Sequence, residues 1–129
     1  MRIDLDQTKD RGAFIKSRRV YHQVSVMKIA GGFLLVSAFF HILGSILSGF
    51  STVGLFLLFP AALYSAFYFG LLRGLKWVAW LALVCMLGGI AGTVLELLKP
   101  STIPDWILWA VVAADLGAAV FLARSLFLK

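Results

Sequence analysis

After residue 28 the chain is dominated by long apolar runs, which are continuous rather than alternating with polar positions. A helix needs about 20 mostly apolar residues to cross the hydrocarbon core of a bilayer, so these runs predict membrane-spanning helices. The expected spans are residues 29–48, 52–72, 77–98 and 106–127. Because a membrane β-barrel would show alternation instead, the pattern predicts an all-α polytopic membrane protein with four transmembrane helices.

The connections between the apolar runs are short and contain turn-forming residues. Gly49 and Gly74 lie in the first two connections, and the third contains Pro100 and Pro104, which cannot continue a helix. Connections this short make consecutive helices antiparallel neighbours. We therefore expect two parts: a basic N-terminal segment, residues 1–28, and an up-down antiparallel four-helix bundle, residues 29–129.

Composition supports the membrane class, and the distribution of charge predicts an orientation. The chain is 61% hydrophobic and 14% charged, whereas soluble domains carry about 25% charged residues. Residues 29–72 contain no Asp, Glu, Lys or Arg, which excludes an ordinary soluble domain and nucleic-acid binding through a solvated basic surface. Of the 12 lysines and arginines, only Lys99 falls outside the N-terminal segment, the second connection and the C-terminal tail. The positive-inside rule then places both termini in the cytoplasm, and we expect a bacterial inner (cytoplasmic) membrane.

The N-terminal segment carries seven basic and three acidic residues, with apolar residues between them. Two interpretations stay open. The segment lies on the membrane surface and binds anionic lipid headgroups, or it is an orientation signal with local disorder. The candidate headgroup contacts are Lys16, Arg18, Arg19 and Lys28.

One acidic residue, Asp115, lies in the middle of a predicted span, about nine residues from its start. An ionised carboxylate at this depth costs about 2.5–3.5 kcal/mol on insertion scales, so it needs a partner, a proton or water. His41 lies at a similar depth in the first span, which neighbours the last span in a square bundle. We predict a buried polar pair in which His41 and Asp115 form a hydrogen bond or an ion pair.

Further polar residues share faces of the predicted spans and define a possible polar pathway. Its candidate members are Ser37, Ser45, Tyr64, Ser65, Tyr68 and Glu96. For Glu96 the alternative is an interfacial ion pair with Lys99, three residues later. Small residues favour close helix packing, as in the Gly88-x-x-x-Gly92 pattern. The candidate packing glycines are Gly44, Gly88, Gly89, Gly92 and Gly117.

Residues that could support redox or metal chemistry are scarce. A single cysteine, Cys85, cannot form an intrachain disulfide, and His22 and His41 are the two histidines. Because they lie roughly 28 Å apart on one helix, they cannot bind the same metal ion. We expect no metal site and no cofactor, with a tetrapyrrole or quinone at His41 left open. No nucleophile–base pair or phosphate loop is present, so we expect no enzymatic activity.

Three functions fit these features. The favoured one is a non-catalytic accessory or assembly subunit that associates with a larger membrane complex through its helices. The first alternative is a small oligomeric transporter or proton-coupled carrier that uses His41 and Asp115. The second alternative is a pigment-, haem- or quinone-binding membrane protein that uses His41. The expected partners are the lipid bilayer with its anionic headgroups, and a membrane protein or further copies of the chain.

Overall fold

The computed structural model describes residues 3–127, and within this range it contains four α-helices. They are α1 (Ile3–Leu47), α2 (Thr52–Leu72), α3 (Lys76–Leu97) and α4 (Asp105–Phe127). Each helix is long and apolar enough to cross a membrane, consistent with an integral membrane protein. The prediction of an all-helical chain with four such helices is confirmed. The bounds of α2, α3 and α4 differ from the expected spans by no more than one residue.

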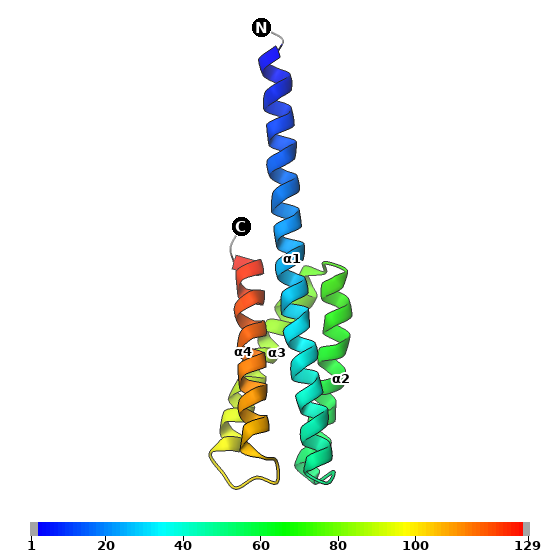
Figure 1. The fold of residues 1–129 in the computed structure, drawn as a ribbon, viewed down its shortest axis with the longest axis vertical. Helices are drawn as coiled ribbons and strands as arrows, with labels where there is room; N and C mark the ends of the chain where they lie inside the picture. Colours follow the sequence, from blue (N-terminus) through cyan, green and yellow to red (C-terminus); the bar gives the residue numbers. More distant parts are fainter. Residues whose placement is uncertain (1–2, 128–129) are drawn as a thin grey trace.

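Helix α1 is 45 residues long, about twice the length of any other helix. Residues 3–28 continue without a break into the first predicted span, whereas a separate segment on the membrane surface or local disorder was expected there. Figure 1 shows the first half of α1 projecting beyond the ends of the other three helices. The described side chains of α1 before Gln23 are accordingly exposed. The basic segment is therefore a helical extension of the first span.

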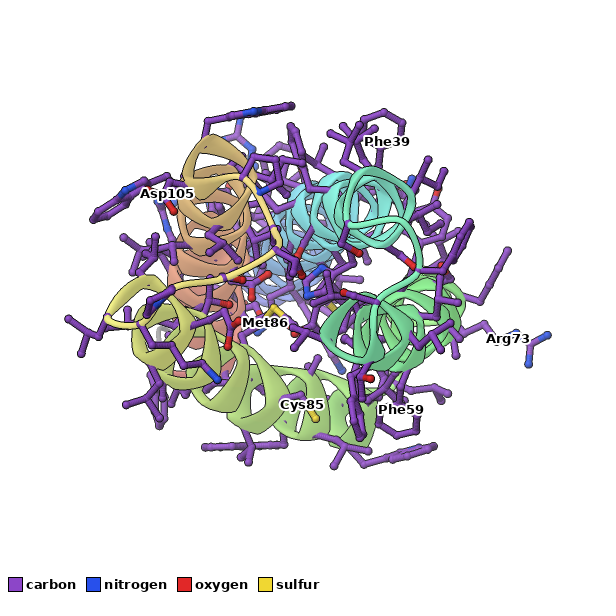
Figure 2. The ribbon with its side chains drawn as sticks, turned by 90° about the horizontal axis from the view of Figure 1, so that it is seen from below. Phe39, Phe59, Arg73, Cys85, Met86 and Asp105 are labelled. Atoms are coloured by element: carbon purple, nitrogen blue, oxygen red, sulfur yellow. The ribbon has the colours of Figure 1, made fainter. Side chains whose placement is uncertain are left out.

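The helices surround a common centre, which Figure 2 shows in a view along the bundle. Helix α1 packs against α2 and α4, and α3 packs against α4, whereas the contact between α2 and α3 is much smaller. The first residues of α1 and the last residues of α4 point toward the same end of the bundle (Figure 1). The interface between α2 and α3 is thus the loosest one in the bundle.

Two apolar clusters form the interior. The larger cluster contains Leu34, Met86 and Leu122, and the smaller one contains Ile107 and Val111 near the opposite end. Along α4, a buried polar stretch separates them. Large apolar side chains also cover the outside of the bundle, as Phe39 and Phe59 show in Figure 2. An apolar exterior around the whole bundle is the surface that lipid chains require.

Sharp turns connect the helices. The turn between α1 and α2 uses a positive φ at Gly49 (65°) and at Phe50 (54°). Ser51 then caps α2, since its hydroxyl accepts a hydrogen bond from the Gly54 amide at 3.2 Å. The next turn uses a positive φ of 70° at Gly74. These turns join consecutive helices through connections of only a few residues.

Candidate functional site

Residues from all four helices meet between the two apolar clusters. Ser37 and His41 come from α1, Tyr64 from α2, Gly89 from α3 and Asp115 from α4. The side chains of Ser37 and Asp115 are fully buried, and those of His41 and Tyr64 are only 4% and 2% exposed. We call these five residues the polar centre.

Ser37 connects the other polar groups. Its hydroxyl donates a hydrogen bond to Oδ1 of Asp115. His41 Nδ1 donates to the backbone carbonyl of Ser37 at 2.7 Å, one turn earlier on the same helix. Among the residues that the structure describes, no hydrogen bond or ion pair joins His41 directly to Asp115. The predicted direct pair is therefore absent, because Asp115 lies level with Ser37 rather than with His41, one helical turn of about 5.4 Å away.

The second carboxylate oxygen of Asp115 has no partner. Within residues 3–127, Asp115 Oδ2 and Ser45 Oγ are the buried side-chain polar atoms that lack a hydrogen bond. A Cβ atom added at Gly89 would lie 2.9 Å from Asp115 Oδ2 and 2.7 Å from the Tyr64 hydroxyl. Both oxygens therefore lie against the backbone of Gly89, where a side chain at residue 89 would collide with them.

Tyr64 is held against the histidine. The rings of Tyr64 and His41 pack edge to face, with 5.3 Å between their centroids and an interplanar angle of 88°. This packing fixes the tyrosine ring, yet its hydroxyl makes no hydrogen bond to any described residue. The polar centre thus presents one acceptor, Asp115 Oδ2, and one group that can donate or accept, the Tyr64 hydroxyl.

A cavity of about 210 Å³ lies beside the polar centre, at the loose interface between α2 and α3. His41, Tyr64 and Gly89 line it, and Pro60 and Glu96 contribute to its walls. Since a water molecule occupies about 30 Å³ in the liquid, the cavity has room for roughly seven waters or a small solute. No pattern in the sequence predicts this cavity, because its presence depends on how loosely two helices pack.

The other residues of the predicted polar pathway lie outside the polar centre. Ser45 is buried one turn beyond His41 and has no partner. Ser65 donates to the carbonyl of Ala61 in its own helix at 2.9 Å. Tyr68 of α2 packs against α1. A Cβ atom added at Gly31 would lie 2.9 Å from the tyrosine ring.

Glu96 lines the cavity and also forms an ion pair. Its carboxylate lies 2.9 Å from the Lys99 ammonium, three residues later in the chain. The lysine side chain is 60% exposed, so this pair lies at the surface of the bundle. Of the possible pathway, the structure therefore brings together Ser37, Tyr64 and Glu96 around the polar centre and its cavity.

The glycines predicted to pack helices fall into two groups. Gly44, Gly89 and Gly117 lie at contacts between helices, where an added Cβ would meet a neighbouring side chain at 2.7–3.0 Å. At Gly88 and Gly92, by contrast, an added Cβ would meet nothing within 4 Å. Gly88 and Gly92 therefore pack closely against no helix of this chain: Gly88 is exposed on α3, and Gly92 lines the cavity between α2 and α3.

The four candidate headgroup contacts lie in different surroundings. Lys16 and Arg19 line a second cavity, at the base of the projecting part of α1. Arg18 instead lies over the ring of Phe14, at 5.1 Å from its centroid. Lys28 is exposed and does not line that cavity.

Cys85 lies on α3 as a free, half-buried thiol. Among the described residues, no group of three or more histidine, cysteine or acidic side chains could hold a metal ion. Comparison of the chain with protein-family models, with curated proteins and with solved structures gave no match. The described fold and site define a four-helix chain, suited to a membrane, with a buried polar centre beside a small cavity. We therefore argue function from these features alone.

Proposed function

We propose that this protein is a small membrane carrier that binds a proton, or a small solute with a cationic or hydrogen-bond-donating group, at the polar centre. The observation that supports this proposal is the unpartnered, fully buried Oδ2 atom of Asp115, which lies against Gly89, a residue that lines the cavity together with Tyr64. Acidic residues within membrane spans are costly, and they typically mark proton relays and solute pathways. The proposal includes a chain that crosses a bacterial inner membrane up and down four times, with both termini cytoplasmic.

The contacts suggest a role for each residue. The Ser37 hydroxyl holds one carboxylate oxygen of Asp115 and so orients the other oxygen toward Gly89, which lines the cavity. A donor group of the solute would then bind Asp115 Oδ2, with the Tyr64 hydroxyl beside it. His41, anchored by the Ser37 carbonyl, forms the wall of the cavity behind the tyrosine ring. Opening of the loose α2–α3 interface would admit the solute, since α2 and α3 pack less closely than α1 packs against α2 or α4.

A tetrapyrrole fits this site poorly. Sites for drug-sized ligands typically have volumes of about 300–1,000 Å³, and the cavity at His41 measures about 210 Å³. We therefore favour a proton or a small solute over a pigment or haem.

Proton flux into liposomes tests the proposal. The purified protein is reconstituted with a pH-sensitive dye inside the liposomes, and a pH gradient is imposed while valinomycin and potassium clamp the membrane potential. We expect wild-type flux above that of protein-free liposomes, and loss of this excess in Asp115→Asn, because an amide cannot release a proton. Asp105→Asn is the matched control, since Asp105 is exposed at the start of the same helix. Wild-type flux equal to that of protein-free liposomes, or equal flux in Asp115→Asn and Asp105→Asn, contradicts proton carriage by the polar centre.

A second function, an accessory subunit that associates with a membrane complex through its helices, is supported by the exposed, uncrowded position of Gly88 on α3. Small residues allow two transmembrane helices to approach closely. Purification in a mild detergent should then retain a foreign membrane subunit in stoichiometric amount. Gly88→Leu should release it, while Gly32→Leu, at an open glycine on α1, should not. Recovery of this chain alone contradicts an accessory role.

A further inference from the structure

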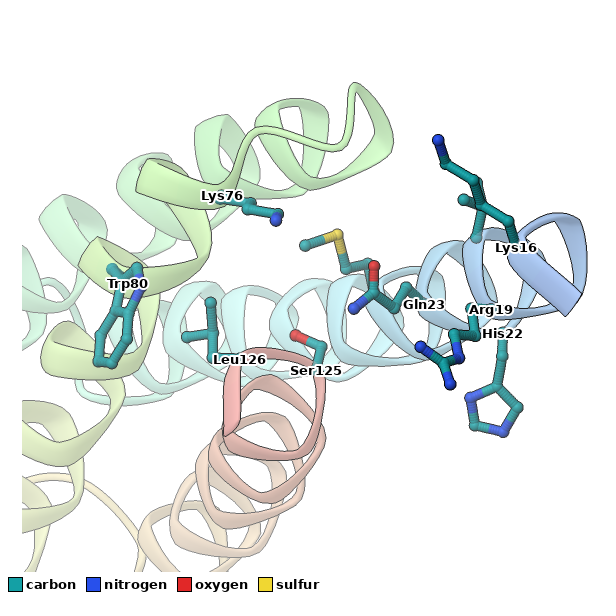
Figure 3. Close-up of a pocket in the computed structure, with 10 residues that line it drawn as sticks. Lys16, Arg19, His22, Gln23, Lys76, Trp80, Ser125 and Leu126 are labelled. Carbon is teal, nitrogen blue, oxygen red and sulfur yellow. The ribbon is translucent and has the colours of Figure 1, made fainter. Parts of the chain in front are cut away.

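The second cavity, of about 520 Å³, lies at the end of the bundle where α3 begins and α4 ends. Figure 3 shows its walls: the lower part of the projecting half of α1, the first turns of α3 and the last turn of α4. Lys16 and Arg19 belong to the α1 wall, and Lys76 extends toward it from the start of α3 (Figure 3). This cavity lies at the rim of the bundle and is separate from the polar centre.

The cations of this cavity have no anionic partner in the described chain. No acidic side chain lines the cavity, and His22 adds a further basic group to its wall. Among the side chains that the structure describes, the one ion pair joins Glu96 to Lys99 at the opposite end of the bundle. Like charges gathered in a cavity create a positive potential, which favours occupation by an anion.

The rest of the lining is suited to an amphiphile. Met27, Trp80 and Leu126 provide an apolar floor, and the Gln23 amide adds a hydrogen-bond donor near the cations. The floor lies where the apolar helices end, and a tryptophan at this level is typical of the boundary between hydrocarbon and headgroups. An anion bound here would have charged groups on one side and hydrocarbon on the other.

We propose that this cavity binds the phosphate headgroup of an anionic phospholipid. Arg19 and Lys76 contact the phosphate, Gln23 donates to it, and an acyl chain lies along Trp80. Arginine suits this role because its planar guanidinium binds phosphate in a bidentate manner. The site is independent of the proposed carrier function, and it joins basic residues that lie far apart in the sequence.

Native mass spectrometry of the detergent-solubilised full chain tests this site. Dioleoylphosphatidylglycerol and dioleoylphosphatidylcholine are added at equal concentration, and the bound lipid is counted. We expect the anionic lipid to bind at least about tenfold more tightly, because the basic residues at the cavity attract its net negative charge. Arg19→Gln with Lys76→Gln should weaken its binding by about tenfold or more.

The control pair, Arg18→Gln with Lys28→Gln, removes the same charge from outside the cavity and should weaken binding by about twofold at most. Equal weakening by both pairs would show diffuse attraction to the basic helix and would overturn the site. Equal binding of the two lipids would overturn it as well. Inorganic phosphate at about 10 mM distinguishes the source of the phosphate group. Failure of this anion to displace the lipid supports a phospholipid, and full displacement overturns that assignment.

Discussion

Removal of the Ser37 hydroxyl should destabilise the protein only while Asp115 is present. In the wild type, this hydroxyl is the one donor to the Asp115 carboxyl group among the described residues. Ser37→Ala therefore leaves a fully buried carboxyl group with no hydrogen bond at either oxygen. In an Asp115→Ala background, the same substitution removes a hydroxyl that no longer binds a carboxylate. The two substitutions should consequently show strong non-additivity.

The size of the expected loss of stability follows from the hydrogen bond between Ser37 and Asp115. Leaving a buried polar group unsatisfied costs about 1–3 kcal/mol, whereas hydrogen bonds between membrane helices average about 0.6 kcal/mol and reach about 1.7 kcal/mol. We expect Ser37→Ala to lower the free energy of unfolding by about 1–2 kcal/mol in the wild type. In the Asp115→Ala background we expect a loss below about 0.5 kcal/mol, within the range for independent sites. The coupling energy is then about 1 kcal/mol.

Unfolding by increasing fractions of sodium dodecyl sulfate in mixed micelles, followed by circular dichroism and tryptophan fluorescence, measures each free energy. Ser65→Ala is the matched control, because Ser65 donates only to the Ala61 carbonyl of its own helix. Its cost should be the same with and without Asp115. A Ser37→Ala cost that is equal in both backgrounds, to within about 0.3 kcal/mol, would refute the hydrogen bond as an energetic link.

Three further predictions address the same site. A His41→Ala and Asp115→Ala cycle should give a smaller coupling energy than the serine cycle, and a larger one in the same micelle assay would indicate direct pairing. Gly89→Ala should cost about 1–3 kcal/mol by crowding the polar centre, while Gly88→Ala should be neutral or slightly stabilising. The apolar reagent dicyclohexylcarbodiimide should add to the protonated carboxyl group of Asp115 as an N-acylurea. Peptide mass spectrometry should find this adduct at Asp115, and modification confined to the exposed Asp105 would contradict access through the cavity.

The lengths of the apolar runs were sufficient to predict three of the four helices to within one residue, because run length and the intervening Gly and Pro residues decide where such helices end. The extension of α1 was not predicted. Residues 3–28 contain no apolar run, yet they also contain no proline and only one glycine, Gly12. That composition permits a helix, but it does not distinguish a continuous helix from a separate surface segment.

The sequence identified the polar residues of the centre but gave the wrong contact between them. Counting residues from the edge of a span estimates depth only to about one helical turn, and it gives no helix rotation. His41 and Ser37 are one turn apart on the same face of α1. An error of one turn in depth therefore made His41 the predicted partner of Asp115 in place of Ser37. The cavity could not be predicted from the sequence for a different reason. It depends on the small contact between α2 and α3, which no local sequence pattern determines.

The geometry of the polar centre favours binding over a purely structural role. A carboxylate retained only for packing would be expected to have both oxygens satisfied, since buried unsatisfied groups are costly. Here Oδ2 of Asp115 lacks a partner among the described residues, although the Tyr64 hydroxyl lies against the same glycine. Glycine at position 89 permits this close approach, because a Cβ there would lie less than 3 Å from both oxygens. A free acceptor and a free hydroxyl next to one cavity are explained together if a proton carrier, such as water, or a small solute binds them from that cavity while the protein works.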